Sequence, residues 1–411
     1  MRTHDPYAAL RVPAFRRYFT GNVILILGWQ MQRVAVGWEI YERTGSALHL
    51  GYVGLAQFLP QVIFALVAGH ITDAYNRKRV LMASLALNTA AAVGLAWNSV
   101  QSGSIFLMYV FLLLNGSARA FVMPARSAFL PRIVPLGIFP NAVSWNTSGF
   151  EIASMTGPAI GGLLIGFFQS ATLDYAINAF GGMMFMVLLS NVAYKHQPQE
   201  RQAITMRSVS AGFRFIWKSK VVLSAIMLDM FAVLLGGATA LMPIYAKDIL
   251  QVGPSGLGWL LTAPSLGAFT MALLQAHRRP LQRPGQTLLL AVAGFGTVTI
   301  LFGISRNFWF SLVMLYLLGA FDNISVVIRT TLVQTLTPDE MRGRVSALNS
   351  LFVGTSNELG AFESGLVAGL FGPVFSVVSG GIGTLLVVAG TTWLSPQLRR
   401  QTLLGNSDSS G

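Results

Sequence analysis

Twelve apolar stretches dominate this sequence of 411 residues, and most are about twenty residues long. Hydrophobic residues make up 53% of the chain and charged residues only 10%, and a soluble domain could not keep so much apolar surface from water. About twenty apolar residues are what a helix needs to cross the hydrocarbon core of a bilayer. The stretches do not alternate as the strands of a transmembrane barrel would. They lie at roughly 18–42, 48–69, 80–98, 104–124, 141–168, 172–193, 221–245, 255–276, 286–304, 308–330, 345–369 and 374–395.

The sequence also contains a weak internal repeat. When the sequence is aligned with itself at an offset of 203 positions, several Gly, Pro and Arg residues align with identical residues. An offset of 204 positions extends the match to the earlier part of each half. A duplicated hydrophobic chain is typical of membrane transporters built from two related halves. The matched residues are Gly116, Arg126, Pro135, Asn146, Gly157, Gly162, Gly166 and Phe168, which fall on Gly319, Arg329, Pro338, Asn349, Gly360, Gly365, Gly369 and Phe371.

The repeat and the longest polar interval predict the domain organisation. We expect an all-α membrane protein of twelve transmembrane helices in two pseudo-symmetric six-helix bundles, at 1–193 and 221–398. A cytoplasmic linker at 194–220 separates them, and its second part, around Phe213 to Lys218, resembles a short amphipathic helix lying on the inner membrane surface. A polar tail at 399–411 completes the chain.

The basic charge is distributed unevenly between the two sides of the membrane. The formal net charge is +13. If both termini are cytoplasmic, only Arg43, Lys247 and Arg306 fall in outer loops, while most of the 28 Lys and Arg residues face the cytoplasm. This asymmetry follows the positive-inside rule. The charge therefore indicates topology rather than a nucleic-acid partner, and we expect a multi-pass protein of a bacterial plasma (inner) membrane.

Few ionisable residues fall inside the predicted spans. A charge at bilayer depth costs at least ~2.5 kcal/mol, so each such group needs a partner or a water-filled cavity. Glu39 falls close to an outer helix end and Asp174 at the outer surface. The bases inside the spans are Arg33 and Arg119, and the acids are Asp229, Asp322, Glu151, Glu358 and Glu363.

The five intramembrane acids are candidate proton carriers. Burial disfavours the charged form of a carboxyl group, so such a group can exchange a proton near neutral pH. No histidine competes, because all five lie in loops or at span ends. An alternative interpretation is that a buried ion pair, for example Arg119 with an acid, only holds two helices together.

The repeat singles out one pair of these charges. Arg119 falls on Asp322, so the two halves carry opposite charges at equivalent depth. Arg119 and Arg126 are seven residues apart and share one helix face, as do Asp322 and Arg329. We therefore expect Arg119 and Asp322 to face one central cavity.

A loop motif between the second and third spans resembles that of the major facilitator superfamily. Gly69 is followed by Asp73 and then by Arg77 and Arg79. The resemblance implies that Asp73 contacts the start of the eleventh span as part of a gate, with Arg77 and Arg79 as its partners. Asn76 stands where the family pattern has Gly, and Asn also tolerates left-handed backbone geometry. The alternative is a basic topology loop with one solvated Asp.

A glycine motif in the fifth span resembles one found in antiporters of the same superfamily. It consists of Gly157, Pro158, Gly161 and Gly162. Small residues let helices approach closely and Pro bends a span, so plain helix packing is the alternative explanation.

The stretches 118–126 and 337–345 and the run from Asn357 to Gly365 resemble the subgroup of enterobactin exporters and macrolide efflux pumps. Val122 and Met123 replace the Gln and Gly that this subgroup has after the arginine of its fourth span.

The resemblance implies a secondary active transporter. We expect a proton-coupled exporter of small amphipathic organic molecules such as drugs or siderophores, driven by the proton gradient without a cofactor. An uptake permease or a lipid flippase on the same fold is the alternative. The expected partners are a small-molecule substrate and the lipid bilayer, and the chain is expected to be a monomer. The sequence shows neither a phosphate-binding loop nor a nucleophile beside a base, which argues against an enzyme or an ATP-driven pump.

Overall fold

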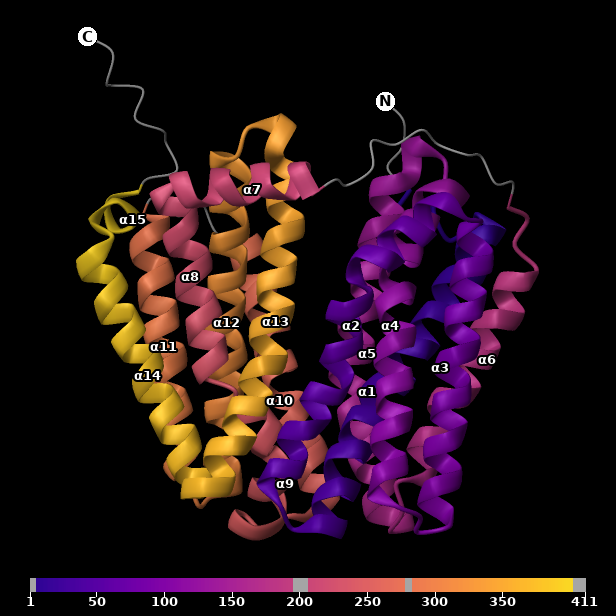
Figure 1. Ribbon diagram of the computed structural model, residues 1–411, viewed down its shortest axis with the longest axis horizontal. Coiled ribbons are helices and arrows are strands. Elements are labelled where there is room, and N and C mark those ends of the chain that lie inside the picture. Colours follow the sequence, from indigo (N-terminus) through magenta and orange to yellow (C-terminus); the bar gives the residue numbers. More distant parts are fainter. Residues whose placement is uncertain (1–4, 195–205, 278–282, 402–411) are drawn as a thin grey trace. The chain divides into compact units, whose positions relative to one another are not determined.

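The computed structural model describes residues 5–194, 206–277 and 283–401, apart from the side chains of Leu66, Asp73 and 206–211. The described residues form helices and no strand. The predicted linker residues 195–205 and the tail from 402 onward lie outside the described residues. Two compact units divide the chain, and we describe each by itself (Figure 1).

Unit 1 covers residues 1–45, 55–201 and 252–262. In it, α1 packs on α5 and α6, and α3 packs on α4 and α6. A core of buried aromatic and aliphatic side chains joins these helices, with Tyr18, Phe129 and Phe185 among its largest members. The helices are α1 (Pro13–Thr44), α2 (Ala47–Ala74), α3 (Arg77–Val100), α4 (Ile105–Ile133), α5 (Phe139–Phe168) and α6 (Thr172–Ser190), with the 3₁₀ turn η1 (Leu136–Ile138) before α5.

Unit 2 covers residues 46–54, 202–251 and 263–411. Here α8 packs on α13 and α14, and α11 packs on α12 and α14. These contacts repeat those of unit 1 helix for helix, as the internal repeat predicts. The helices are α7 (Met206–Lys218), α8 (Lys220–Leu235), α9 (Met242–Ile244), α10 (Gly253–Ala276), α11 (Pro284–Ile304), α12 (Phe308–Leu336), α13 (Asp339–Phe371), α14 (Pro373–Leu394) and α15 (Pro396–Arg400).

The unit bounds differ from the predicted bundles in two short segments. Residues 46–54, at the start of α2, belong to unit 2, and residues 252–262, at the start of α10, belong to unit 1. The first turns of α2 therefore pack on α13, and the first turns of α10 pack on α5. Each of these two helices contributes to both units.

The predicted seventh span is not one continuous helix. After α8 ends at Leu235, Gly236 and Gly237 interrupt it, and the chain continues through the 3₁₀ turn η2 (Ala238–Leu241), the short α9 and the π-helical turn η3 (Tyr245–Ile249). Glycine is a poor helix former, and Pro243 cannot donate a backbone hydrogen bond. The amphipathic segment of the linker forms α7, which runs across the ends of the unit 2 helices (Figure 1).

Ten segments of the described chain are long and apolar enough to cross a membrane. The predicted spans outside this group are the first and the eleventh, which form α1 and α13, of 32 and 33 residues. Both are long enough to span but carry more polar and charged side chains than the other helices. Arg33 and Glu39 lie on α1, and Glu358 and Glu363 lie on α13.

The glycines matched by the repeat make matched helix crossings. A Cβ on Gly116 of α4 would collide with the carbonyl oxygen of Gln57 on α2, and one on Gly319 of α12 would collide with that of Pro264 on α10. In the same way, a Cβ on Gly162 would lie 2.6 Å from Gly258 Cα, and one on Gly365 would lie 2.6 Å from Gly51 Cα. The repeated glycines are therefore the points where backbones touch.

We predict that Gly319→Ala destabilises the protein, because the added methyl group meets a backbone oxygen that cannot move aside. Overpacking of this kind typically costs about 1–3 kcal/mol. Thermal unfolding of the purified protein, followed by tryptophan fluorescence, measures the effect. Gly354→Ala on α13 is the matched control, because nothing lies within 4 Å of its added Cβ, and it should unfold at or slightly above the wild-type temperature. Equal unfolding temperatures for the two variants would contradict the packing argument.

Candidate functional site

A buried ion pair lies among the helices of unit 2. Asp229 on α8 is 3% exposed, and its Oδ2 lies 3.2 Å from Nη2 of Arg329 on α12. The Ser325 hydroxyl donates a hydrogen bond to Asp229 Oδ1 at 3.3 Å. Arg329 also donates to Oδ1 of Asn349 on α13, at 2.9 Å. Three helices thus meet at one charged cluster, which satisfies the need of a buried charge for a partner.

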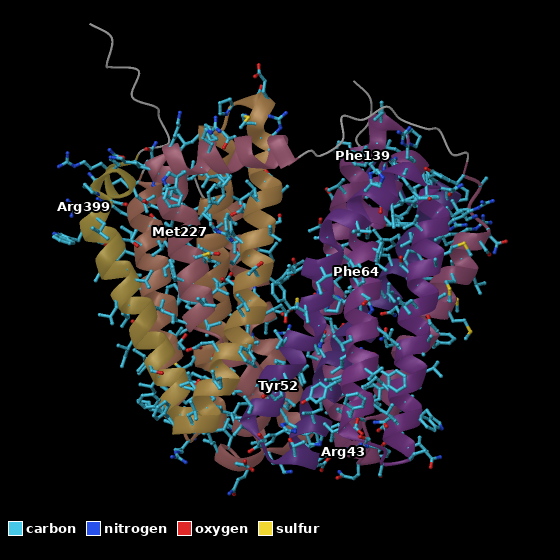
Figure 2. All side chains as sticks on the ribbon, viewed as in Figure 1. Arg43, Tyr52, Phe64, Phe139, Met227 and Arg399 are labelled. Carbon is cyan, nitrogen blue, oxygen red and sulfur yellow. The ribbon has the colours of Figure 1, made fainter. Side chains whose placement is uncertain are left out.

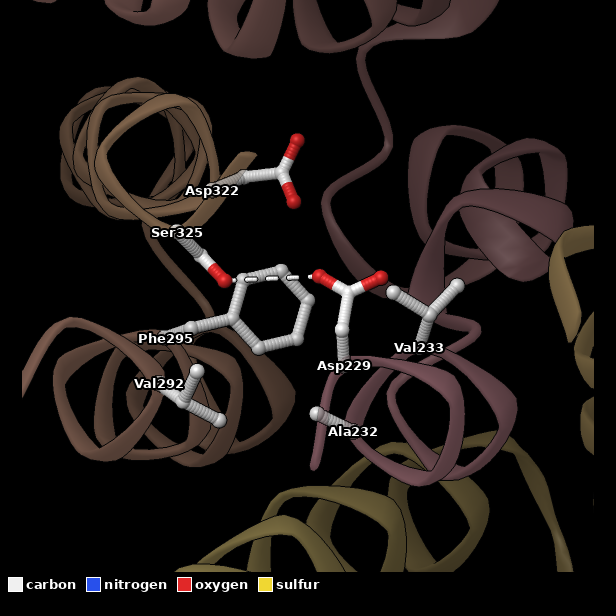
Figure 3. A pocket seen from close by; sticks show the side chains of 7 residues that line it. All are labelled: Asp229, Ala232, Val233, Val292, Phe295, Asp322 and Ser325. Carbon is white, nitrogen blue, oxygen red and sulfur yellow. Dashed lines mark hydrogen bonds between the residues drawn. The ribbon is translucent and has the colours of Figure 1, made fainter. Parts of the chain in front are cut away.

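A second carboxylate borders the same cluster. Asp322 is half-buried on α12, one helical turn before Ser325, and points toward the space that Asp229 also faces (Figure 3). The small pocket between them is lined by Asp229, Ala232, Val233, Val292, Phe295, Asp322 and Ser325. Asp229 and Asp322 were both predicted as proton carriers, and the structure brings them together.

The cluster has two acids for one base. With Asp229, Asp322 and Arg329 all ionised it carries one net negative charge, and uptake of one proton makes it neutral. Two carboxyl groups that share a site of low dielectric favour the singly protonated state. The arrangement can therefore bind a single proton, and in the protonated cluster no charged side chain lacks a counter-charge.

The other three candidate acids lie apart from this cluster. Glu151 is half-buried on α5 of unit 1. Glu358 and Glu363 are half-buried on α13, and Glu363 accepts a hydrogen bond of 3.4 Å from Ser364. Glu358 borders the first turns of α2, because its Oε2 lies 3.6 Å from a Cβ placed on Gly54. Their role in proton transfer stays a prediction.

Arg119 lies in unit 1 against an aromatic ring. Its guanidinium carbon is 5.3 Å from the centre of the Trp29 ring, and its Nη1 is 3.5 Å from Gln57 Oε1. A buried amide network orients that ring: Trp29 Nε1 and Asn115 Nδ2 both donate to Asn88 Oδ1 at 2.9 Å. Unit 1 therefore presents a cation on an aromatic plane, held by side chains of α1, α3 and α4.

Arg33 differs from the expectation of a buried base. Its side chain is exposed on α1. We find no ion pair between Arg33 and any residue that the structure describes. On a helix, positions 31, 32 and 34 turn toward the core, where Met31, Gln32 and Val34 are buried, so position 33 turns away from it.

The predicted gate loop is partly described. Arg77 is buried, and its Nη1 donates to the carbonyl oxygen of Ala128 at 3.3 Å, while Arg79 is exposed. Gly69 lies within α2, and the side chain of Asp73 lies outside the described residues. Asn76 is not left-handed: it is the N-cap of α3, with φ −61°, and its side chain accepts hydrogen bonds from the backbone amides of Lys78 and Arg79. An Asn in place of the family's Gly thus starts the helix.

The glycine motif of α5 packs two faces of the helix. A Cβ on Gly157 would lie 2.5 Å from Gln30 Cβ on α1, and one on Gly161 would lie 3.1 Å from Met31 Cα. Gly162 faces the other way, toward Gly258 on α10, and Pro158 lies within the continuous helix. The motif therefore holds α5 between α1 and the first turns of α10.

Three polar groups have a larger part in the structure than the sequence suggested. Arg329 was noted as a repeat match to Arg126 on the same helix face as Asp322, but its ion pair with Asp229 was not foreseen. Glu39 was placed close to an outer helix end and Asp174 at the outer surface, and both are buried in the protein, at 5% and 0% exposed. An apolar helix that carries one acid near its end gives no sign of which face that acid occupies, so only the packing could show their burial.

We predict that Asp229→Asn lowers the stability of the protein. Removing one partner leaves Arg329 buried without its counter-charge, which typically costs about 3–5 kcal/mol. Thermal unfolding in detergent measures it, with Glu340→Gln at an exposed position as the control. The double variant Asp229→Asn, Arg329→Gln should recover part of the loss. A single Asp229→Asn variant as stable as the wild type would show that the pair contributes nothing.

Comparison with known proteins places the fold. Residues 4–403 match the family model described as transmembrane secretion effector. The chain is 28% identical over 390 residues to the enterobactin exporter EntS of Escherichia coli O1:K1, covering 94% of this chain and 93% of that protein. EntS of Shigella boydii serotype 18 matches to the same extent.

Solved structures agree on the architecture. A bacterial homologue of the human lysosomal transporter Spinster, in an inward-facing and unoccupied conformation, has a TM-score of 0.74 at 12% identity, covering 95% of this chain and 98% of that one. A D-xylose–proton symporter has a TM-score of 0.72 at 13% identity, covering 95% and 99%. The predicted all-α fold of twelve membrane helices is thereby confirmed. The chain is a multi-pass secondary transporter rather than an enzyme, and it belongs to the transmembrane secretion effector family of the major facilitator superfamily.

Proposed function

We propose that this transporter is a proton-coupled exporter of small amphipathic organic molecules, such as drugs or siderophores. It exchanges substrate for protons by alternating access and needs no cofactor, because the proton gradient drives it. The enterobactin exporters among its relatives support the direction and the substrate class. The expected setting is a bacterial inner membrane with both termini in the cytoplasm and the chain acting as a monomer.

The observation that carries the proposal is the pairing of Asp229 and Asp322 around Arg329. Ionisable residues in membrane helices commonly mark proton relays. Arg329 compensates one carboxylate at a time, so the second one can exchange its proton as the surroundings change. Asp322 is the half-buried member and borders the pocket, which makes it the proton carrier, whereas Asp229 is tied to Arg329.

The substrate side of the proposal rests on unit 1. Trp29 offers an aromatic face, Arg119 a positive charge, and Gln57 an amide beside Arg119. Such a combination suits aromatic molecules that carry oxygen acceptors, since stacking and charge-assisted hydrogen bonds act together. The expectation from the repeat that Arg119 and Asp322 face one central cavity stays a prediction.

Alternating access requires that the helix contacts at the glycine crossings can open and close. In a two-half transporter one half rocks against the other. The first turns of α10, seated on α5 at Gly162, and those of α2, seated on α13 at Gly365, must then leave their partners during each cycle. Backbone contacts between glycines suit this motion, because few side chains have to rearrange.

We predict that Asp322→Asn abolishes proton-coupled transport while leaving the protein folded. Cells that express the wild type should tolerate higher doses within a panel of macrolides, cationic dyes and enterobactin, and cells with the variant should match the empty vector. In everted vesicles, adding a transported compound to the wild type should release protons from the lumen, which a pH-sensitive dye reports. Glu340→Gln is the control at an exposed carboxylate.

Other outcomes separate the alternatives. Transport by Asp322→Asn that keeps its full dependence on the proton gradient would overturn the role of Asp322. Uptake in right-side-out vesicles would indicate a permease, and movement of a labelled phospholipid between leaflets would indicate a flippase. If the wild type shifts susceptibility to no compound of the panel, the drug-export part of the proposal is wrong.

We also predict that a disulfide between α5 and α10 stops transport. A Cβ on Gly166 would lie 3.4 Å from Ser255 Cβ, close to the spacing that a disulfide needs. The chain has no cysteine, so Gly166→Cys with Ser255→Cys introduces the only thiols. Oxidation should block transport and a reductant should restore it, whereas either single variant should be insensitive. Full activity of the cross-linked protein would contradict separation of α5 and α10.

A further inference from the structure

A buried carboxyl group at the other end of unit 1 takes no part in the proposed proton site. Asp174 is the third residue of α6 and is fully buried. Neither of its carboxylate oxygens has a hydrogen-bond partner among the residues that the structure describes. Its neighbour Tyr175 hydrogen-bonds to Glu39, the ion-pair partner of Arg43, and Figure 2 labels Arg43 at the end of unit 1 opposite Phe139.

The base that pairs with neighbouring Glu39 is already engaged. Arg43 forms an ion pair with Glu39, one turn earlier on α1, and donates to the carbonyl oxygen of Gly103 at 3.0 Å. The Tyr175 hydroxyl donates to Glu39 Oε2 at 2.7 Å. Glu39 thus has both a counter-charge and a hydrogen bond, whereas Asp174, next to Tyr175, has neither.

Within the part of the chain that the structure describes, no other charged group in the packed elements is placed to compensate Asp174. Arg33 on α1 is exposed and turns away from the core. The ionisable residues of α3 are Arg77, Lys78 and Arg79 at its opposite end. On α5 the only one is Glu151, ten residues before Gly161, and α10 has none. Burying an ionised carboxylate in such surroundings costs far more free energy than the favourable interaction with a helix N-terminus recovers. Asp174 is therefore stable where it lies only with a proton bound.

The side chain of Asp174 touches the glycine motif. Its Oδ1 would lie 3.3 Å from a Cβ on Gly161, beside the backbone of Met31. The next residue of the motif, Gly162, forms the crossing with Gly258 on α10. One turn of α5 thus has the Asp174 carboxyl group on one face and the α10 crossing on the other.

We propose that Asp174 is a proton-binding site whose occupancy stabilises the packing of α5 between α1, α6 and the first turns of α10. Loss of the proton leaves a bare charge against Gly161, which must draw in water or move α5 away. Either change loosens the crossing of Gly162 and Gly258. The site differs from the cluster around Asp229 in unit, helix and residues, and it requires no assumption about the substrate.

The first test measures the proton directly. Infrared spectra of the full-length protein in lipid vesicles, recorded at neutral and at alkaline pH, report protonated carboxyl groups by their C=O stretch. We expect a band at neutral pH that is present in the wild type and absent in Asp174→Asn, because Asn has no carboxyl group. Asn keeps the shape of the protonated carboxyl group, so the packing should be preserved. Identical spectra for the two proteins would overturn the proposal. Asp174→Leu, which also removes the proton, gives the same comparison if Asp174→Asn does not fold.

The second test measures the link to α10. The Gly166→Cys, Ser255→Cys pair is oxidised at a series of pH values, once with Asp174 and once with Asp174→Asn or Asp174→Leu. At each pH, the disulfide yield with Asp174 is divided by the yield with the neutral variant. This division removes the pH dependence of the thiol chemistry, which is the same in both proteins. We expect the yield with Asp174 to fall, relative to the neutral variants, as the pH rises. A ratio that does not change with pH would show that Asp174 does not act on the crossing, whether or not substrate export is coupled to protons.

Discussion

The hydrocarbon core of a membrane offers no hydrogen bonds to a polar group, and this constraint governs the structure. Apolar side chains gain little there by packing on one another, so the helices associate where backbones can approach closely. Glycines at the crossings of α4 with α2 and of α12 with α10 provide that approach. The same constraint forces each charged side chain to find a partner inside the protein or to hold a proton. Helix packing and charge placement thus both follow from the apolar environment of the bilayer.

The two units solve this problem with the same scaffold and different polar groups. Matched glycines make matched crossings in both. The repeat-matched asparagines differ in their partners: Asn146 accepts a hydrogen bond from Asn22, whereas Asn349 accepts one from Arg329. Unit 2 gathers carboxylates around an arginine, and unit 1 places an arginine on an aromatic ring. Duplication preserved the backbone contacts and left the side chains in the polar interior free to diverge.

Much of the fold could be predicted from the sequence, because membrane spans follow from the length and apolar character of local segments. The interruption of the seventh span at Gly236 and the exchange of the first turns of α2 and α10 between units were not foreseen. Of the candidate site, Asp229 and Asp322 were among the five acids chosen, and the structure places both beside one pocket, whereas the ion pair of Asp229 with Arg329 was not foreseen. Arg33 was expected inside and is exposed. A helical sequence gives the spacing of charges along one helix and says little about which neighbouring helix each one meets.

The sequence by itself determined that the chain is helical, crosses the membrane repeatedly, and is built from two related halves. Hydrophobicity and repeated glycines are properties of local segments, and they act in the same way wherever the segments lie. Only the tertiary structure decided that Asp229 pairs with Arg329, that Trp29 lies beneath Arg119, and that Asp174 is sealed inside unit 1 without a partner. These outcomes depend on which helix faces meet, and that choice is made by the packing of all the helices of a unit together.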